Sequence, residues 1–251
     1  MSDILLILEG AKTDKILFER LLSVYNIQNH NIYTYNTNIY SLYNQLTKKG
    51  YVEDDQIDFD SISLPLLLNE IFNNEQTKKI SQMIFSDIIL VFDFDPQDSN
   101  YDYTKLFNLQ KGFNDSTDKG QLYINYPMIE SIKHHTSIPS DVTDFFNLEI
   151  DFKVVKEKKY KAQIGNLTCI SDFKKITKEQ FNFLISLHRN KMDYLNSTYL
   201  SKWLLEQHDD NFLNLLSLEN FHLDTNQKIF VQNTCIFYIL DYNPNLIGKK
   251  L

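Results

Sequence analysis

The stretch that decides the fold is residues 87–98, DIILVFDFDPQD. Residues 88–92 form a continuous apolar run, which predicts a strand that is covered on both faces. Pro96 follows soon after, and because proline has no backbone N–H to donate, it ends the strand. Residues two apart in a strand point the same way, so Asp93 and Asp95 are expected to face one site.

Two carboxylates held close together repel each other, and a divalent cation between them is the usual remedy. Asp93 and Asp95 therefore become candidate metal ligands. The alternative is an ordinary turn after a strand, where aspartate is common for its own local reasons. The stretch taken alone leaves both interpretations open.

A second apolar strand is predicted at residues 3–8, DILLIL, and it is closed by Glu9 and Gly10. Thr13 is expected to cap a helix with one apolar stripe. In an open parallel sheet, ligands bind at the carboxyl ends of the strands. Glu9 would share that edge with Asp93 and Asp95, which favours the metal interpretation.

Strands and helices alternate through the first half of the chain. Strands are predicted at 31–35 and 121–126, and helices at 39–49, 64–74, 75–83 and 104–113, while the acidic block 53–60 is expected to be a loop. A further helix is expected to begin at Pro127 and to carry Glu130 in its first turn. This alternation predicts an α/β fold with a mainly parallel sheet flanked by helices.

The pattern changes near residue 140, so we expect one domain at 1–140 and an appended, mostly helical subdomain at 141–251. A lysine-rich and partly β-forming stretch is expected to reach residue 172, followed by helices at 178–194, 199–207 and 211–218. The apolar segment 228–240 is expected to be a last strand or a buried helix.

The formal net charge of −8 opposes a protein that grips nucleic acid over a broad surface. The segment 153–191 is nevertheless rich in lysine, and its candidate nucleic-acid contacts are Lys156, Lys158, Lys159 and Lys161. The alternative is a solvated helix face. No charged-then-apolar leader opens the sequence and no apolar run approaches membrane-spanning length, so we expect a cytoplasmic protein without membrane contact.

An apolar strand ending in Glu-Gly, a helix, and a later apolar strand ending in Asp-x-Asp together resemble the Toprim domain. The segment Glu9-Gly10-Ala11-Lys12-Thr13-Asp14 is similar to the Glu-Gly-x-x-Thr-Glu opening of RloB-like Toprim proteins of bacterial defence loci, with Asp14 where Glu is commoner. The segment 123–130, YINYPMIE, resembles the strand-to-helix element of such stand-alone Toprim-like proteins. The Toprim domain also occurs in the overcoming-lysogenisation-defect (OLD) nucleases. The resemblance covers residues 3–136.

The resemblance implies a Toprim-like, Rossmann-like fold and a Mg²⁺- or Mn²⁺-dependent nuclease. Asp93 and Asp95 would hold the metal, and Glu9 would be a further ligand or the general base. Asp14 and Glu130 would support a second ion or orient the ligands. The implied substrate is DNA or RNA, including tRNA, and the implied setting is anti-phage defence with a partner ATPase. The oligomeric state stays open.

Two other functions compete with this hydrolase. A haloacid-dehalogenase-type phosphatase also uses an apolar strand followed by Asp-x-Asp, but it expects Gly-Thr directly afterwards, where this chain has Pro96 and Gln97. A non-catalytic interaction subunit with a Toprim fold would keep the sheet and lose the activity. Metal binding and cleavage assays separate the three possibilities.

Overall fold

The central sheet of the computed structural model, which describes residues 3–139 and 141–247, has the strand order β2-β1-β5-β7-β6. Strands β2, β1, β5 and β7 are parallel, and β6 is antiparallel to β7 at one edge. These strands are β1 (Asp3–Leu8), β2 (His30–Thr34), β5 (Phe85–Asp93), β6 (Asn114–Asp115) and β7 (Gly120–Asn125). The predicted α/β fold with a mainly parallel sheet is confirmed.

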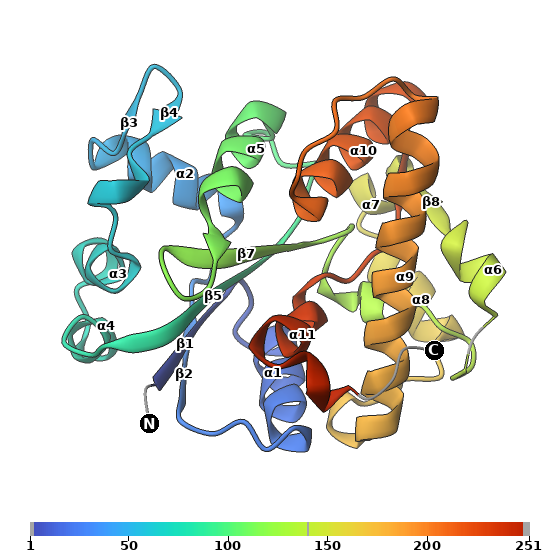
Figure 1. Ribbon diagram of the computed structural model, residues 1–251, viewed down its shortest axis with the longest axis horizontal. Helices are drawn as coiled ribbons and strands as arrows, with labels where there is room; N and C mark the ends of the chain where they lie inside the picture. The colour runs from blue at the N-terminus through green and yellow to red at the C-terminus, as the bar shows by residue number, and fades with distance from the viewer. Residues whose placement is uncertain (1–2, 140, 248–251) are drawn as a thin grey trace.

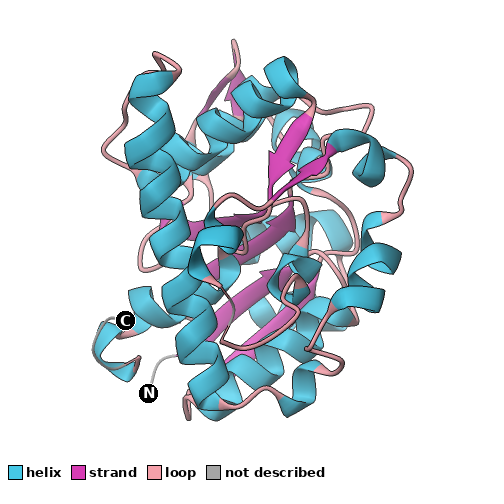
Figure 2. Ribbon diagram, turned by 90° about the vertical axis from the view of Figure 1, so that its right-hand side faces the viewer, coloured by secondary structure: helices cyan, strands magenta, loops and turns pink. Residues whose placement is uncertain are grey.

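Helices lie on both sides of this sheet (Figures 1 and 2). Helices α1 and α11 lie on one side of it, and α2 and α5 lie on the other (Figure 1). The α-helices of the first half are α1 (Thr13–Val24), α2 (Ile39–Lys48), α3 (Leu64–Phe72), α4 (Glu75–Ile80) and α5 (Tyr103–Gly112). Strands β1 and β5 are almost wholly buried from Ile4 to Leu8 and from Ile89 to Phe92, because helices cover both of their faces.

The second half is mostly helical and packs against the sheet through a continuous hydrophobic core. Its α-helices are α6 (Val142–Phe146), α7 (Phe152–Lys156), α8 (Tyr160–Leu167), α9 (Lys178–Lys202), α10 (Asn211–Asn226) and α11 (Tyr238–Tyr242). Two short strands, β8 (Glu149–Asp151) and β9 (Lys228–Phe230), pair antiparallel. The expected domain boundary falls at residue 140, which lies outside the described residues.

The segment after β9 returns to the central sheet. Tyr126 and Gln232 form an antiparallel bridge, in which each residue's amide donates to the other's carbonyl at 2.8 and 2.9 Å. Asn125, at the end of β7, accepts the amides of Thr234 and Cys235 through its Oδ1, at 3.2 Å each. The two halves of the chain therefore meet at the carboxyl end of β7.

The acidic block 53–60 was expected to be a loop, and this expectation is wrong in part. It contains most of a small hairpin, β3 (Val52–Glu53) and β4 (Gln56–Ile57), followed by the 3₁₀ turn η1 (Phe59–Ser61). Asp54 and Asp55 have φ of 48° and 60°, which is the left-handed pair that a two-residue hairpin turn requires. Aspartate tolerates that conformation, so it serves where glycine is usual.

Three expected helices differ in the structure, and the last of them, expected to reach residue 207, ends at Lys202. The helix expected after Pro127 is the five-residue 3₁₀ turn η2 (Ile129–Lys133), whose amides bond three residues back. The helices expected at 178–194 and 199–207 are one helix, α9. The sequence Asn196-Ser197-Thr198 has low helix propensity, but Leu195 is buried and Asn196 donates to the Asn211 carbonyl at 3.2 Å, so tertiary packing overrides propensity.

Three short 3₁₀ turns complete the second half: η3 (Phe173–Lys175), η4 (Cys235–Phe237) and η5 (Pro244–Leu246). The segment 228–240, which the sequence left open between strand and helix, contains both, because β9 is followed by η4 and then by α11. Within residues 3–139 and 141–247, no helix has the combination of length and apolar character that crossing a membrane requires.

Candidate active site at the carboxyl edge of the sheet

The register of the sheet brings Glu9 and Asp93 to the same edge. Leu8 of β1 pairs with Val91 of β5, so Glu9 lies one residue beyond β1 and level with the end of β5. Asp93, the last residue of β5, pairs with Asn125, the last residue of β7. The carboxyl ends of parallel strands meet at one edge, and this edge is where such sheets bind ligands.

Glu9 and Asp93 are joined through the backbone. Glu9 Oε2 accepts the Asp93 amide at 3.0 Å, and Asp93 Oδ1 accepts the Ile129 amide at 2.7 Å. These two bonds tie the ends of β1 and β5 to the start of η2. A backbone amide thereby holds each carboxylate in place, and the second oxygen of each carboxylate can still accept a hydrogen bond or bind a cation.

Asp95 is positioned by a turn rather than by the strand. Strand β5 ends at Asp93, and Asp95 has a φ of 42°, so the period-two argument that placed both aspartates on one face of a strand does not apply. Its Oδ1 accepts the Gln97 side-chain amide at 2.8 Å. Asp95 nevertheless lies near the same site, since its charge raises the pKa of both Glu9 and Asp93.

Asp14 joins this edge from the first turn of α1. Its Oδ2 accepts the Gly10 amide at 2.8 Å. A Cβ atom at Gly10 would lie 2.7 Å from Asp14 Oδ1, which is closer than van der Waals contact allows. Glycine at this position is therefore what lets the buried Asp14 carboxylate pack against the turn after β1.

Glu130 and Lys161 supply an ion pair beside these carboxylates. Glu130 Oε1 lies 3.0 Å from Lys161 Nζ, and the Glu130 residue is 8% exposed. Its other oxygen, Oε2, is buried and has no hydrogen-bond partner among the described residues. Lys161 comes from α8 and keeps a mostly exposed side chain, so it reaches the edge from the solvent side.

Burial is the main cause of the unusual acid–base properties of these groups. It raises the pKa of Glu9 to about 8, with help from the charge of Asp95. It raises the pKa of Asp14 to about 6, with help from Glu130, and it raises the pKa of Asp93 and of Asp95. Shifts of this kind, several of them in one cluster, are typical of functional sites.

Lys161 is a cation that acts on several members of the cluster. Its charge lowers the pKa of Glu9, Asp14 and Asp95 against the larger effect of burial. Burial opposes its own protonation, but the neighbouring acids outweigh that effect and raise its pKa. A bound divalent cation would favour the ionised forms of these carboxyl groups, which burial disfavours.

The donor chemistry of this edge fits a hard divalent cation. All five acidic side chains offer oxygen, which is what Mg²⁺ and Mn²⁺ prefer, and one buried oxygen of Glu130 has no partner. As they stand, however, no three Asp, Glu, His or Cys side chains among residues 3–139 and 141–247 are grouped closely enough to hold an ion. Ion binding would thus require these side chains to draw together.

The four candidate nucleic-acid lysines have three different surroundings. Lys161 lies at the carboxylate cluster. Lys159 pairs with Glu157 at 2.5 Å. Lys156 and Lys158 are exposed near the start of α8, on the segment that leads to Lys161. Sequence reasoning named Lys161 as a weak phosphate contact and missed that it faces the acids, because the contact joins residues 31 positions apart.

Comparison with known proteins gave no match to a protein-family model, to a curated protein or to a solved structure.

Proposed function

We propose that this protein is a metal-dependent nuclease of the Toprim type that cleaves phosphodiester bonds in DNA or RNA. The observation that carries the proposal is the group of Glu9, Asp93 and Asp95 at the carboxyl edge of a parallel sheet, with raised pKa values. Clustered carboxyl groups whose ionised forms burial and mutual repulsion disfavour are groups that a bound divalent cation would stabilise.

In this proposal, Asp93 and Asp95 hold Mg²⁺ or Mn²⁺, and Asp14 and Glu130 support them. The bound ion would neutralise charge that develops on the phosphate and activate a water molecule. Glu9, with a pKa of about 8, is suited to exchange a proton near neutral pH, which is the property of a general acid or base. Lys161 offers a positive charge to a phosphate that approaches from solvent.

The protein's acidic total charge favours a substrate held locally rather than over a broad surface. The exposed Lys156 and Lys158, on the same segment as Lys161, provide the local positive charge for it. A partner ATPase in a bacterial anti-phage system would supply activation and further grip, as the resemblance to Toprim nucleases implies. The proposal includes tRNA among the possible RNA substrates.

A second candidate function is a non-catalytic interaction subunit. One observation favours it: the described carboxylates, Glu9, Asp93 and Asp95 included, do not form a ready group of metal ligands. A subunit of this kind would keep the sheet and the edge hydrogen bonds while binding divalent cations weakly. Direct measurement of Mn²⁺ binding separates it from the nuclease.

The deciding experiment is a cleavage assay on supercoiled DNA and on total tRNA, with Mg²⁺ or Mn²⁺ and with EDTA. We expect cation-dependent cleavage that falls at least about a thousandfold in Asp93→Asn and in Glu9→Gln, because both remove a group that acts on the reacting phosphate. The matched control is Asp118→Asn, the same aspartate-to-asparagine substitution at an exposed position, and this variant should cleave as the wild type does. Cleavage that survives both edge substitutions would contradict the proposal.

A further inference from the structure

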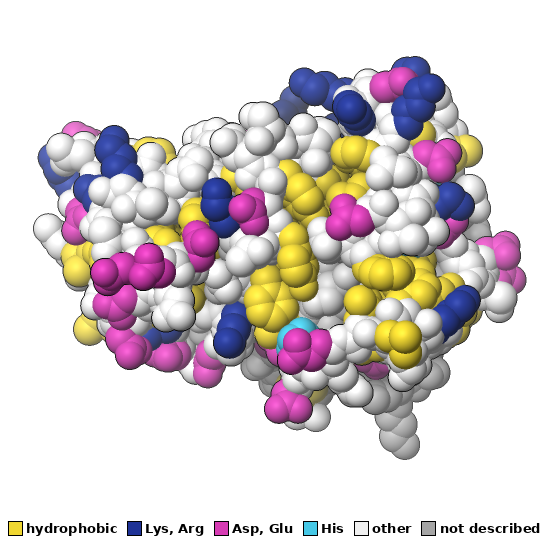
Figure 3. All heavy atoms as spheres, turned by 90° about the horizontal axis from the view of Figure 1, so that it is seen from above, with side chains coloured by type: hydrophobic (Ala, Val, Ile, Leu, Met, Phe, Trp, Pro, Cys, Tyr) yellow, Lys and Arg dark blue, Asp and Glu magenta, His cyan; other side chains and the backbone are white. Residues whose placement is uncertain are grey.

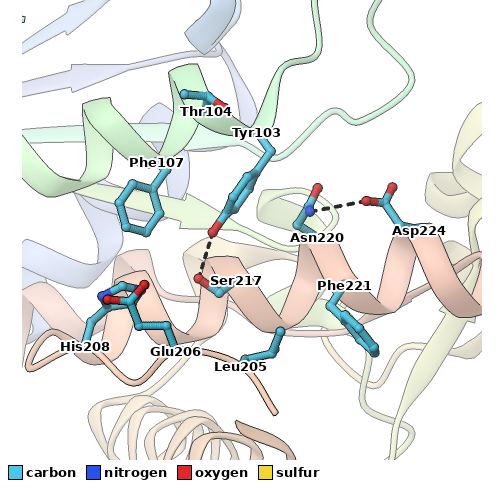
Figure 4. Close-up of a pocket in the computed structure, with 10 residues that line it drawn as sticks. All are labelled: Tyr103, Thr104, Phe107, Leu205, Glu206, His208, Ser217, Asn220, Phe221 and Asp224. Carbon is cyan, nitrogen blue, oxygen red and sulfur yellow. Dashed lines mark hydrogen bonds between the residues drawn. The ribbon is translucent and has the colours of Figure 1, made fainter. Parts of the chain in front are cut away.

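A cavity of about 390 Å³ lies between α5 and α10, away from the carboxylate cluster. Its walls come from α5, from the loop that follows α9, and from α10 (Figure 4). The lining residues are Tyr103, Thr104, Phe107, Leu205, Glu206, His208, Ser217, Asn220, Phe221 and Asp224. This volume falls within the range of pockets that bind small molecules or single side chains.

The walls of the cavity are aromatic and apolar. Tyr103 and Phe107 point from α5 toward α10, with His208 below Phe107 (Figure 4). The rings of Phe107 and His208 lie 5.2 Å apart between centroids. Seen from above, the middle of the molecule exposes apolar side chains that are bordered by acidic and basic ones (Figure 3). An apolar surface of this kind gains free energy when an apolar stem covers it.

The charges of the lining residues all have one sign. Glu206 and Asp224 are exposed carboxylates, and no lysine or arginine lines the cavity. Asp224 also accepts the side-chain amide of Asn220 at 3.3 Å. Phosphate and carboxylate ligands would be repelled here, whereas a cation would be attracted both by the acids and by the faces of the aromatic rings.

Hydrogen bonds hold the three walls in place before any ligand arrives. Tyr103 Oη and Ser217 Oγ lie 2.9 Å apart and tie α5 to α10, while Tyr101, in the loop before α5, donates to Asn220 Oδ1 of α10 at 2.7 Å. The loop is fixed by Asn214, whose side chain bonds both the amide and the carbonyl of His208 at 2.8 Å. A pocket formed in advance loses less entropy on binding.

We propose that this cavity binds an organic cation, a guanidinium or ammonium group on an apolar stem. The stem would pack against the contacting rings of Tyr103 and Phe107, whose centroids lie 5.7 Å apart. The charged head would lie near Glu206, with Asp224 adding negative charge from the other end of the cavity (Figure 4). The same chemistry can come from a free amine or from an arginine or lysine side chain that a partner protein presents. This inference does not rest on the proposed nuclease activity, since none of its residues belongs to the carboxylate cluster.

The single tryptophan of the chain gives a local reporter for the test. Trp203 packs on Phe221, a lining residue, with ring centroids 4.9 Å apart. Butylguanidinium should change the Trp203 fluorescence saturably, with a dissociation constant of roughly 0.1 to 1 mM. Its neutral isostere, butylurea, should bind at least about tenfold more weakly, because it lacks the charge.

The charge requirement is tested in the protein as well. The double variant Glu206→Gln/Asp224→Asn should bind butylguanidinium about tenfold more weakly, and both sites are exposed, so the fold should survive. The matched control Glu75→Gln/Asp118→Asn removes two exposed carboxylates elsewhere and should leave binding unchanged. Equal affinity for butylguanidinium and butylurea, an unaffected charge variant, or no saturation below about 10 mM would each overturn the proposal.

A peptide arm identifies the source of the cation. If acetyl-Gly-Arg-Gly-amide binds at least about tenfold more tightly than butylguanidinium, the natural ligand is a side chain on a polypeptide, since the flanking backbone then adds contacts. If the two bind equally, a free amine is the ligand. Both results support an organic cation in the cavity. In either case, the double variant Glu206→Gln/Asp224→Asn must weaken the binding of both the peptide and butylguanidinium.

Discussion

Two regions of this molecule bury ionisable groups, and they differ in how those groups are satisfied. At the edge of the sheet, Glu9 and Asp93 lie beside other acids, and Lys161 is a cation that offsets part of their charge. On the buried face of α9, Lys191 is fully buried, and its Nζ donates to the carbonyls of Leu148 and Val231 at 2.7 and 2.9 Å. In the first region, acids lie together with less positive charge than negative charge, whereas in the second the buried ammonium group of Lys191 has hydrogen-bond acceptors.

The aromatic surroundings strengthen this contrast. Lys191 Nζ lies 4.7 Å from the centroid of the Phe145 ring, a favourable position for a cation. Glu219, fully buried nearby, accepts the Phe230 amide at 3.0 Å through Oε2 and attracts Lys191 through its charge. A buried charge with such partners holds several segments together, which is a structural role. The acids at the sheet edge repel one another and so do not stabilise the fold. This indicates that they serve to bind a cation instead.

The largest expected effect is on the structural side of the comparison. Lys191→Met should lower the free energy of unfolding by about 3 kcal/mol, because two buried carbonyls lose their hydrogen-bond donor and the buried Glu219 loses a favourable nearby charge. Urea denaturation measures the loss. Lys174→Met, which removes an exposed lysine, should change stability by less than about 0.5 kcal/mol. Similar losses in both variants would show that Lys191 does not hold the second half together.

The acidic edge should respond in the opposite direction. With EDTA at pH 8, Glu9→Gln should raise the free energy of unfolding by about 2 kcal/mol, because it removes a buried charge among other acids. The folded pKa of Glu9 is raised from 4.5 to about 8, so the folded protein keeps a proton that the unfolded chain releases between these values. The free energy of unfolding of the wild type therefore increases, through Glu9, as the pH falls from 8 toward 4.5.

The gain of Glu9→Gln over the wild type should accordingly shrink with falling pH and vanish near pH 4.5. Denaturation curves at several pH values measure it. The exposed Glu75→Gln serves as the control and should follow the wild type throughout. If Glu9→Gln instead lowered the free energy of unfolding at pH 8, Glu9 would have a structural role like that of Lys191.

Divalent cations should relieve the same repulsion. At a concentration about ten times its dissociation constant, Mn²⁺ should stabilise the protein by about 1.4 kcal/mol, which for a chain of this size raises Tm by about 3 °C. Asp93→Asn should abolish the shift, whereas Lys191→Met should keep it from its lower starting temperature. A Tm shift that persists in Asp93→Asn would locate the ion elsewhere.

The smallest expected effect concerns Lys161, which is mostly exposed and competes with any metal for the acids. Lys161→Met should tighten Mn²⁺ binding by about threefold while leaving stability within about 0.5 kcal/mol. Calorimetric titration measures the affinity. Lys156→Met, on the neighbouring exposed segment, should leave the Mn²⁺ affinity unchanged. If it tightened Mn²⁺ binding as much as Lys161→Met, the effect would come from the total charge of the protein rather than from the contact of Lys161 with the acids.

Much of the fold was predictable, because the apolar runs at residues 3–8 and 88–92 can only be buried strands and the turns between elements carry ordinary signals. The edge positions of Glu9 and Asp93 followed from where those runs end. The turn at Asp95 was not predictable, since a left-handed φ outside glycine depends on what surrounds it. The Glu130–Lys161 contact and the burial of Lys191 were missed because periodicity carries no information about which distant segments meet.

The bridge between Tyr126 and Gln232 also has a consequence for synthesis. The end of β7 receives part of its hydrogen bonding from Thr234 and Cys235, which leave the ribosome more than a hundred residues later. Contacts so distant in sequence form late, after the local elements. The edge that carries Asp93 therefore reaches its final form only after Thr234 and Cys235 have been synthesised. A ribosome-bound fragment would hold the acids but not the completed edge.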